Sequence, residues 1–249
     1  MAAVIAPALD LLLPPRCPLC GEMVADPNSF CPSCWSELDF ISAPQCSSCG
    51  VPLGNAAHDP DAKLQCAGCI EKAPVHDGIR AVVAYDDVSR AVVLRLKHAG
   101  RIGLAKLIAH FLASRIADMP VDTLIIPVPL HRWRIWRRSF NQAQLIGRAL
   151  GDMTGLEMRD DLLLRTKATP PLKAMRARER EAAVRGAFAL APQARNVLSG
   201  RTLLLVDDVY TTGATANACV RLLKQAGAQK VVIACWARVL AAGEAGTGG

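Results

Sequence analysis

The sequence predicts an α/β domain with a parallel sheet flanked by helices, preceded by a small cysteine-rich module. Residues 203–206 form the apolar run LLLV, which is typical of a strand buried on both faces of a parallel sheet. A helical pattern follows after residue 213. Eight of the ten cysteines lie before residue 70, all in CxxC pairs. We therefore expect a module of residues 1–75 and a domain of residues 76–249.

The domain reads as alternating strands and helices in chain order. Apolar runs predict strands at residues 79–86, 122–128, 203–206 and 231–236, with an edge strand at 187–190. Helical patterns cover residues 88–97 and 104–116, and further helices begin near Asn141 and after Gly213. This alternation favours a parallel sheet with helices on its faces.

The cysteine pairs are spaced as metal-binding knuckles. Gaps of 10, 11 and 16 residues separate successive pairs, and each pair can supply two thiolates to a tetrahedral ion. Full cysteine ligation leaves no open position, so two structural zinc ions are expected. Disulfides and iron–sulfur ligation are the rival interpretations, disfavoured by the poor export signal and by the spacing. The expected ligands are Cys17, Cys20, Cys31 and Cys34 for one ion, and Cys46, Cys49, Cys66 and Cys69 for the other.

The net charge of +7 is unevenly divided. Residues 1–75 hold three basic and eight acidic residues, and the remainder holds 26 basic and 14 acidic residues. A basic body suits polyphosphate or nucleic acid ligands. No segment reaches the ~20 continuous apolar residues of a membrane span, and residues 2–15 make a poor signal peptide because they are short, interrupted and lack a basic leading segment. We expect a cytoplasmic protein with no membrane span.

Two carboxylates and a hydroxyl-rich turn follow the run at residues 203–206. Asp207 and Asp208 come first, and TTGAT at residues 211–215 then opens a helix. Helix-start N–H groups suit a phosphate, and Gly213 lets the backbone approach it closely. The paired acids suit sugar hydroxyls, or a magnesium ion that bridges to further phosphates. The pattern describes a site for ribose 5-phosphate; the plain alternative is a strand–turn–helix corner capped by threonine.

The stretch VDDVYTTGAT resembles the 5-phosphoribosyl-1-pyrophosphate (PRPP) signature of type I phosphoribosyltransferases. The resemblance implies a type I phosphoribosyltransferase-like fold in which Asp207 and Asp208 hold the ribose 2′ and 3′ hydroxyls. It implies displacement of pyrophosphate from PRPP by a nitrogen nucleophile, with magnesium, and makes these two acids the catalytic residues if the chain is an enzyme. The implied PRPP-binding loop comprises Val209, Thr211, Thr212, Gly213, Ala214 and Thr215.

Two basic segments precede this signature. Lys97 lies in LKHAGR at a joint between predicted helices, where it either reaches an anion or forms a solvated helix end. Residues 131–138, HRWRIWRR, interleave arginine with tryptophan, which is typical of base stacking and phosphate pairing but also of a helix edge. The nucleic-acid candidates are Arg132, Trp133, Arg134, Trp136 and Arg137. Arg138 and Lys97 are the candidates to offset charge on the leaving pyrophosphate.

Together, the motifs CPLC…CPSC, LKHAGR, PVPLHRWRIWRRSFNQA and VDDVYTTGAT are similar to those of the ComF family, over nearly the whole chain. The resemblance implies a zinc ribbon joined to a phosphoribosyltransferase-like domain, and a link to natural competence and DNA uptake. It also implies that residues 165–185 form a mobile cover for the pyrophosphate, although TPPLKAMRARERE departs from the commoner form.

Three functions follow from these patterns. The first is a phosphoribosyltransferase of unknown acceptor that acts in DNA uptake and natural competence or in nucleotide-related metabolism. The second is a non-catalytic competence factor that binds PRPP and single-stranded DNA, with competence proteins as partners. The third treats the ribbons as a protein-docking module beside a vestigial ligand site.

Overall fold

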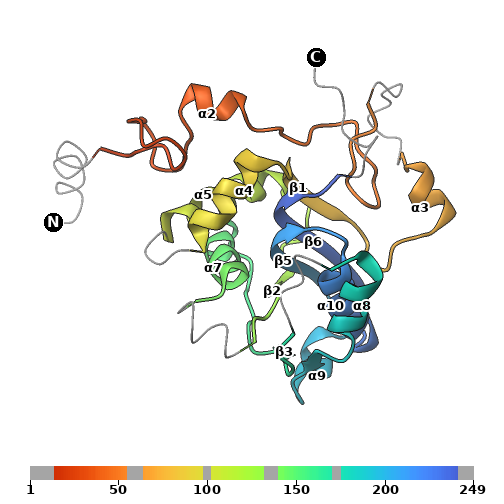
Figure 1. The fold of residues 1–249 in the computed structure, drawn as a ribbon. Coiled ribbons are helices and arrows are strands. Elements are labelled where there is room, and N and C mark those ends of the chain that lie inside the picture. Colours follow the sequence, from red (N-terminus) through yellow and green to blue (C-terminus); the bar gives the residue numbers. More distant parts are fainter. Residues whose placement is uncertain (1–13, 55–63, 98–101, 132–139, 170–174, 241–249) are drawn as a thin grey trace, which may run out of the picture.

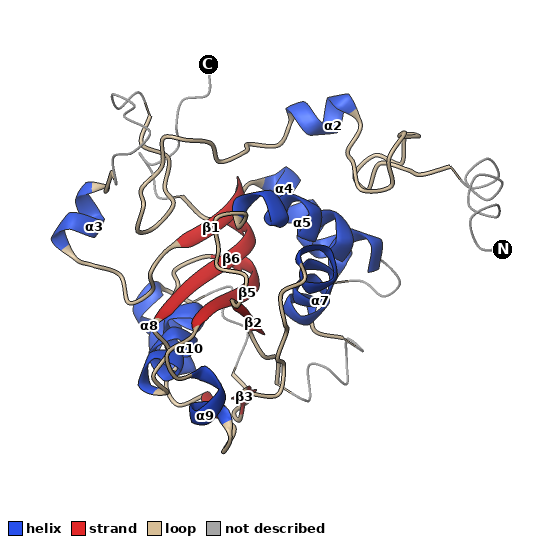
Figure 2. Cartoon of the chain, turned by 180° about the vertical axis from the view of Figure 1, so that it is seen from behind, coloured by secondary structure: helices blue, strands red, loops and turns tan. Residues whose placement is uncertain are grey.

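The computed structural model describes residues 14–54, 64–97, 102–131, 140–169 and 175–240. A parallel sheet lies at the centre of these ranges with helices on both of its faces (Figure 1). The cysteine-rich segment runs along the β1 side of the sheet in both views (Figures 1 and 2). None of the helices in the described ranges has the length and apolar character needed to cross a membrane.

The central sheet has four strands, and all neighbouring pairs are parallel. The two nine-residue strands lie in the middle, paired from Thr202 with Lys230 to Tyr210 with Arg238. The shorter strands flank them. In spatial order the strands are β1 (Ile79–Ala84), β6 (Lys230–Arg238), β5 (Thr202–Tyr210) and β2 (Leu124–Pro127).

Alternate side chains of the sheet enter two separate hydrophobic cores, because successive residues of a strand point to opposite faces. Leu204 and Val206 of β5 lie in one core, and Leu203 and Leu205 lie in the other. The first core is covered by α4 (Asp87–Leu96), α5 (Ile102–Arg115) and α7 (Gln142–Thr154). The second is covered by α8 (Ala177–Val184), α9 (Ala194–Leu198) and α10 (Ala214–Gln225).

Two predicted strands differ from the observed ones. The strand predicted to stop before Asp207 continues to Tyr210, because β6 runs beside it to Arg238 and pairs with it throughout. The segment predicted as an edge strand, β4 (Phe188–Leu190), does not join the central sheet; it pairs antiparallel with β3 (Leu163–Arg165) in a separate sheet. The two acids therefore lie on a strand with a fixed backbone.

The two halves of the cysteine-rich segment are attached differently. The first half carries α2 (Pro32–Ser36), and its Phe30, Cys31, Cys34 and Leu38 lie in the same core as Trp236 of β6. The second half carries α3 (Ala67–Glu71) and has a small core of its own, formed by Cys46, Cys49, Val51 and Cys69.

Short backbone contacts line both outer strands of the sheet. Between the two cysteine groups, the Ile41 N–H donates to the Val82 carbonyl at 3.0 Å, and the Ala84 N–H donates to the Asp39 carbonyl at 2.8 Å. On the opposite side, the Ile125 N–H of β2 donates to the Glu157 carbonyl at 2.8 Å. Each outer strand thus has backbone partners beyond the sheet itself.

Candidate functional site

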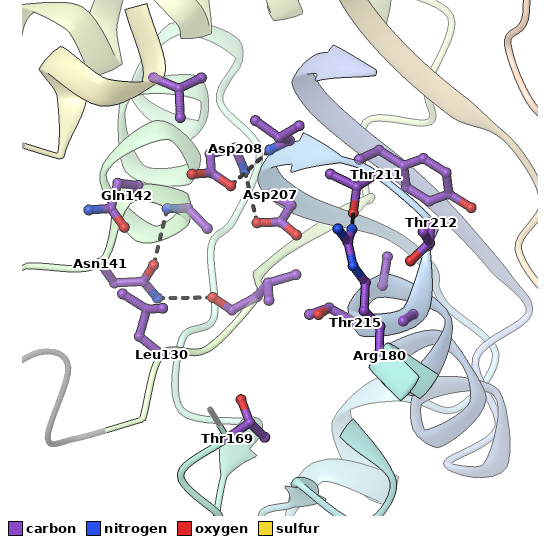
Figure 3. Close-up of a pocket in the computed structure, with 18 of the residues that line it drawn as sticks. Leu130, Asn141, Gln142, Thr169, Arg180, Asp207, Asp208, Thr211, Thr212 and Thr215 are labelled. Carbon is purple, nitrogen blue, oxygen red and sulfur yellow. Dashed lines mark hydrogen bonds between the residues drawn. The ribbon is translucent and has the colours of Figure 1, made fainter. Parts of the chain in front are cut away.

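A cavity of about 910 Å³ opens at the carboxyl end of the sheet (Figure 3). It is lined by α4, the β2–α7 connection, Arg180 of α8, and the segment that joins β5 to α10. In the close-up, Asp207 and Asp208 lie between Asn141 and Gln142 on one side and Thr211 and Thr212 on the other. The predicted residues in its walls are Lys97, Asp207, Asp208, Val209, Thr211, Thr212, Gly213, Ala214 and Thr215.

The other residues predicted to bind the pyrophosphate or nucleic acid lie outside the described ranges. Arg138, expected at the leaving pyrophosphate, falls in the segment 132–139. So do the nucleic-acid candidates Arg132, Trp133, Arg134, Trp136 and Arg137. Their roles stay predictions.

The acid pair is held by its own backbone and by one lysine. The Asp208 N–H donates to Asp207 Oδ1 at 2.9 Å, and the Val209 N–H donates to Asp208 Oδ1 at 2.8 Å. Lys97 Nζ, just after α4, lies 3.0 Å from Asp208 Oδ2. Burial and the adjacent Asp208 carboxylate raise the pKa of Asp207 well above its ordinary value. Lys97 therefore offsets the charge of Asp208, and Asp207 keeps its proton to a higher pH than an ordinary aspartate does.

The turn after β5 has the features of an anion site. Gly213 is the N-cap of α10 with φ 74°, and it has no side chain to satisfy the N–H groups of the first turn. Those N–H groups can donate hydrogen bonds to a phosphate, and the positive end of the helix dipole favours its negative charge. Arg180 Nη1 donates to Thr211 Oγ1 at 3.2 Å, which brings a guanidinium to the same turn. The local arrangement suits a dianionic group.

The opposite wall is organised by Asn141, the N-cap of α7. Its Oδ1 accepts from the Ala143 N–H at 3.1 Å, and its Nδ2 donates to the Val128 carbonyl at 3.0 Å. The neighbouring Gln142 is 3% exposed, and its Nε2 has no hydrogen-bond partner among the described residues. A buried amide donor without a partner is costly, so a ligand acceptor in the cavity would stabilise it.

The sequence patterns gave no ligand role to Asn141 or Gln142, and Arg180 entered only as part of the segment 165–185 that the resemblance places over the pyrophosphate. The sequence predicts a helix that begins near Asn141, and the Asn141 side chain is the N-cap of α7. No local pattern relates Arg180 to Thr211, because the contact spans 31 residues and depends on the packing of α8 against α10.

Replacing Gly213 by alanine should disrupt the turn and cost about 2 kcal/mol more stability than the same change at Gly200. Both glycines have φ 74°, so the backbone strain is equal. A Cβ at Gly213 would lie 2.3 Å from Tyr210 Oη, whereas a Cβ at Gly200 meets no atom within 4 Å. Thermal unfolding of the two variants checks this, and equal melting temperatures would show that the Tyr210 contact is unimportant.

The eight cysteines of the CxxC pairs form two four-cysteine groups. Within each group the four sulfur atoms lie within 4.8 Å of one another. A tetrahedral ion with Zn–S bonds of about 2.3 Å needs sulfur separations of about 3.8 Å. The Cys20–Cys31 and Cys49–Cys66 separations of 3.4 Å and 3.7 Å are close to that value. The groups are Cys17, Cys20, Cys31 and Cys34, and Cys46, Cys49, Cys66 and Cys69.

The backbone around each group favours thiolates. Burial raises the pKa of Cys17, but backbone N–H groups, including that of Cys20, donate hydrogen bonds to its sulfur. Their combined effect is the larger one, so the pKa of Cys17 falls to about 6. Cys46 is affected in the same way, and its pKa falls to about 7. N–H groups directed at sulfur are typical of knuckles that hold a metal, because the thiolate is the ligand form. The clusters therefore fit structural zinc.

Two family models match the chain. The double zinc ribbon domain covers residues 8–70, and the phosphoribosyl transferase domain covers residues 153–245. Among solved structures, the chain is similar to glutamine PRPP amidotransferase from Bacillus subtilis, at 21% identity and a TM-score of 0.35, and to PRPP synthetase from Mycobacterium smegmatis, at 20% identity and a TM-score of 0.33. The matches cover 54% and 55% of this chain, and only 25% and 34% of those chains.

The curated relatives match over most of their length. Competence protein F of Haemophilus influenzae is 29% identical over 225 residues, which cover 88% of this chain and 94% of the relative. DNA utilization protein YhgH of Shigella flexneri is 30% identical over 237 residues, covering 92% and 100%. Competence protein ComFC of Streptococcus pneumoniae is 27% identical over 229 residues, covering 87% and 96%.

The parallel sheet, the two cysteine clusters and the two family models define the class of protein: a phosphoribosyltransferase-like domain that carries an amino-terminal double zinc ribbon. Within that class, the match to YhgH and competence protein F over nearly the entire chain identifies the family. The chain belongs to the ComF family.

Proposed function

We propose that the cavity binds PRPP together with Mg²⁺. The observation that carries the proposal is the meeting of Asp207 and Asp208 with the turn at Gly213 in one cavity. Carboxylates accept hydrogen bonds from the ribose hydroxyls, and the first N–H groups of α10 donate to the 5′-phosphate. Lys97 and Arg180 add positive charge near the acids and at Thr211 respectively.

The donor set also fits a magnesium ion. Mg²⁺ prefers hard oxygen ligands, and the Asp207 and Asp208 carboxylates are the nearby candidates on the chain. When bound with PRPP, the ion would neutralise charge on the pyrophosphate. The residues of the chain would meanwhile orient the ribose and hold the phosphate.

For an enzyme of this kind, the reaction is displacement at the ribose C1. The bond from C1 to the pyrophosphate oxygen breaks as a nitrogen nucleophile forms its bond to the same carbon. The protein supplies orientation and charge rather than covalent chemistry. We assign ribose orientation to Asp207 and Asp208, phosphate binding to the loop from Val209 to Thr215, and leaving-group charge to Lys97 and Arg138.

We further propose a role in DNA uptake by natural competence, in the cytoplasm. The names of the relatives support the role, and cysteine clusters that fit zinc rather than disulfides support a reducing compartment. A non-catalytic factor that binds PRPP and single-stranded DNA and acts with competence proteins is the second candidate, favoured by the 26 basic against 14 acidic residues after residue 75. A steep fall of log affinity for single-stranded DNA with log salt would support it.

Calorimetric titration with PRPP, with and without Mg²⁺, tests the shared part of both candidates. Binding that needs Mg²⁺ and exceeds the affinity for ribose 5-phosphate is the expected result. Pyrophosphate release from PRPP across a panel of nitrogenous bases and amines then separates the enzyme from the non-catalytic factor. Absence of PRPP binding by zinc-replete protein would refute the proposal.

PRPP binding should weaken as the pH falls from above to below the raised pKa of Asp207. Ribose hydroxyls need an ionised acceptor, and the raised pKa of Asp207 makes it take up its proton at a higher pH than an ordinary aspartate. By the same linkage, its contribution to folding stability decreases as the pH rises through that pKa. Titrations of wild type and Asp207→Asn across this range check the prediction. Because PRPP ionises identically in both, a parallel pH dependence in the variant would contradict it.

A further inference from the structure

An incompletely paired cation is buried at the end of β6. Arg238 is 7% exposed, and its Nε and Nη1 have no hydrogen-bond partner among the described residues. Its guanidinium carbon lies 5.8 Å from the ring centroid of Tyr210. His76, also buried, meets the same ring edge-on at 6.1 Å. A buried charge is costly unless an opposite charge lies close to it.

The second cysteine cluster lies beside the end of β6. Leu240, two residues after Arg238, packs against the small core of Cys46, Cys49 and Cys69. A zinc ion with four thiolate ligands has a net charge of −2, for which a buried guanidinium is a suitable counter-charge.

Arg238 also contacts Tyr210, which packs against the phosphate-binding turn. The two residues are paired across β5 and β6, and the Val239 N–H donates to the Tyr210 carbonyl at 2.9 Å. The Tyr210 hydroxyl packs directly on Gly213, since a Cβ there would lie 2.3 Å from its oxygen. Leu240 on the second cluster, Arg238 two residues before it, Tyr210 and Gly213 therefore lie in series from the cluster to the turn.

We propose that Arg238 and Tyr210 couple zinc binding at the second cluster to the conformation of the phosphate-binding turn, residues 211–215. Zinc on the four thiolates holds the guanidinium as its counter-charge. The guanidinium holds the Tyr210 ring, and the ring hydroxyl supports the left-handed turn at Gly213. Arg238 and Tyr210 are thus positioning residues, and their link to PRPP affinity rests on the function proposed above.

The test compares Arg238→Met with Arg95→Met in full-length, zinc-replete protein. Arg95 Nη1 donates to the Pro18 and Leu19 carbonyls at the first cluster, so its replacement removes a cation from the other zinc site. Zinc release to a chromophoric chelator is followed, with alkylation and peptide mapping to identify the freed cysteines. Amide hydrogen exchange of residues 210–217 is measured without ligand, so that it does not depend on PRPP binding.

We expect Arg238→Met to speed zinc release from the second cluster about tenfold and to speed exchange in residues 211–215. Arg95→Met should leave exchange in this turn at the wild-type rate. Tyr210→Phe keeps the ring and removes the hydroxyl, so it should speed exchange in the turn and leave zinc release unchanged.

Unchanged exchange in Arg238→Met would overturn the coupling, and unchanged zinc release would overturn the counter-charge role. If Arg95→Met sped amide exchange in residues 211–215 as much as Arg238→Met does, the coupling would also be overturned. The faster exchange would then reflect a general loosening of the protein. PRPP titration of the same variants separates the two proposals. Wild-type protein that fails to bind PRPP refutes the proposed function, while the exchange rates still decide the coupling.

Discussion

Replacing both Asp207 and Asp208 by alanine is expected to weaken PRPP binding by about 100-fold or more. The change removes both acceptors for the ribose hydroxyls, and charge-assisted hydrogen bonds contribute about 1.5–3 kcal/mol each. The fold should survive for two reasons. The burial of the Asp207 carboxyl is itself unfavourable. The Lys97 side chain is 29% exposed, so it reaches water when Asp208 is removed. Calorimetry measures the affinity, and thermal unfolding verifies the fold.

Asp161→Ala is the matched control for this double variant. Asp161 is an ion-paired carboxylate too, 2.9 Å from Arg159 Nη2, and it is not among the residues that line the cavity. Its replacement should leave PRPP affinity within about twofold of wild type. If the double variant binds PRPP as tightly as this control, the ribose is not held by the acid pair.

Loss of one ligand from the first cysteine cluster should destabilise the entire chain. Elemental analysis should give two zinc ions per wild-type chain and one in Cys34→Ala. Cys31 and Cys34 share a core with Phe30 and Trp236, so loss of that ion loosens the packing on one face of the sheet. We expect the free energy of unfolding to fall by about 4 kcal/mol or more in chemical denaturation.

Cys69→Ala provides the comparison at the second cluster. It should also lose one zinc ion, but the free energy of unfolding should fall less, because this cluster has a small core of its own. Cys219→Ala, which truncates a buried cysteine outside both clusters, should keep two zinc ions. Equal destabilisation by Cys34→Ala and Cys69→Ala would contradict the view that only the first cluster belongs to the main core.

The parts of the fold that could be predicted from the sequence are those with a local cause. The run from Leu203 to Val206 has no alternative to burial, and the acids, glycine and threonines that follow it are adjacent in the chain, so their position at a strand-to-helix turn needs no knowledge of the rest. The CxxC pairs are local in the same sense, because each knuckle is closed within a few residues.

The parts that could not be predicted depend on contacts between distant segments. Lys97 was a candidate for an anion, but its 3.0 Å contact with Asp208 depends on α4 packing beside β5. β5 continues beyond Asp207 because β6 pairs with it there. The intrinsic strand propensity of the two aspartates does not indicate this extension. The pairing of β3 with β4 joins segments separated by α8, and their three-residue length gives almost no periodic signal.

The backbone contacts beside β1 bear on whether an outer strand of the sheet can pair with another chain. An unpaired outer strand is a template for another chain, since its N–H and carbonyl groups can continue the ladder. Here the residues between the cysteine clusters occupy the Val82 carbonyl and the Ala84 N–H, and residues 157–159 do the same for Ile125 of β2. A chain shortened to begin at β1 would expose the first of these strands, so it should be prone to intermolecular strand addition and to aggregation.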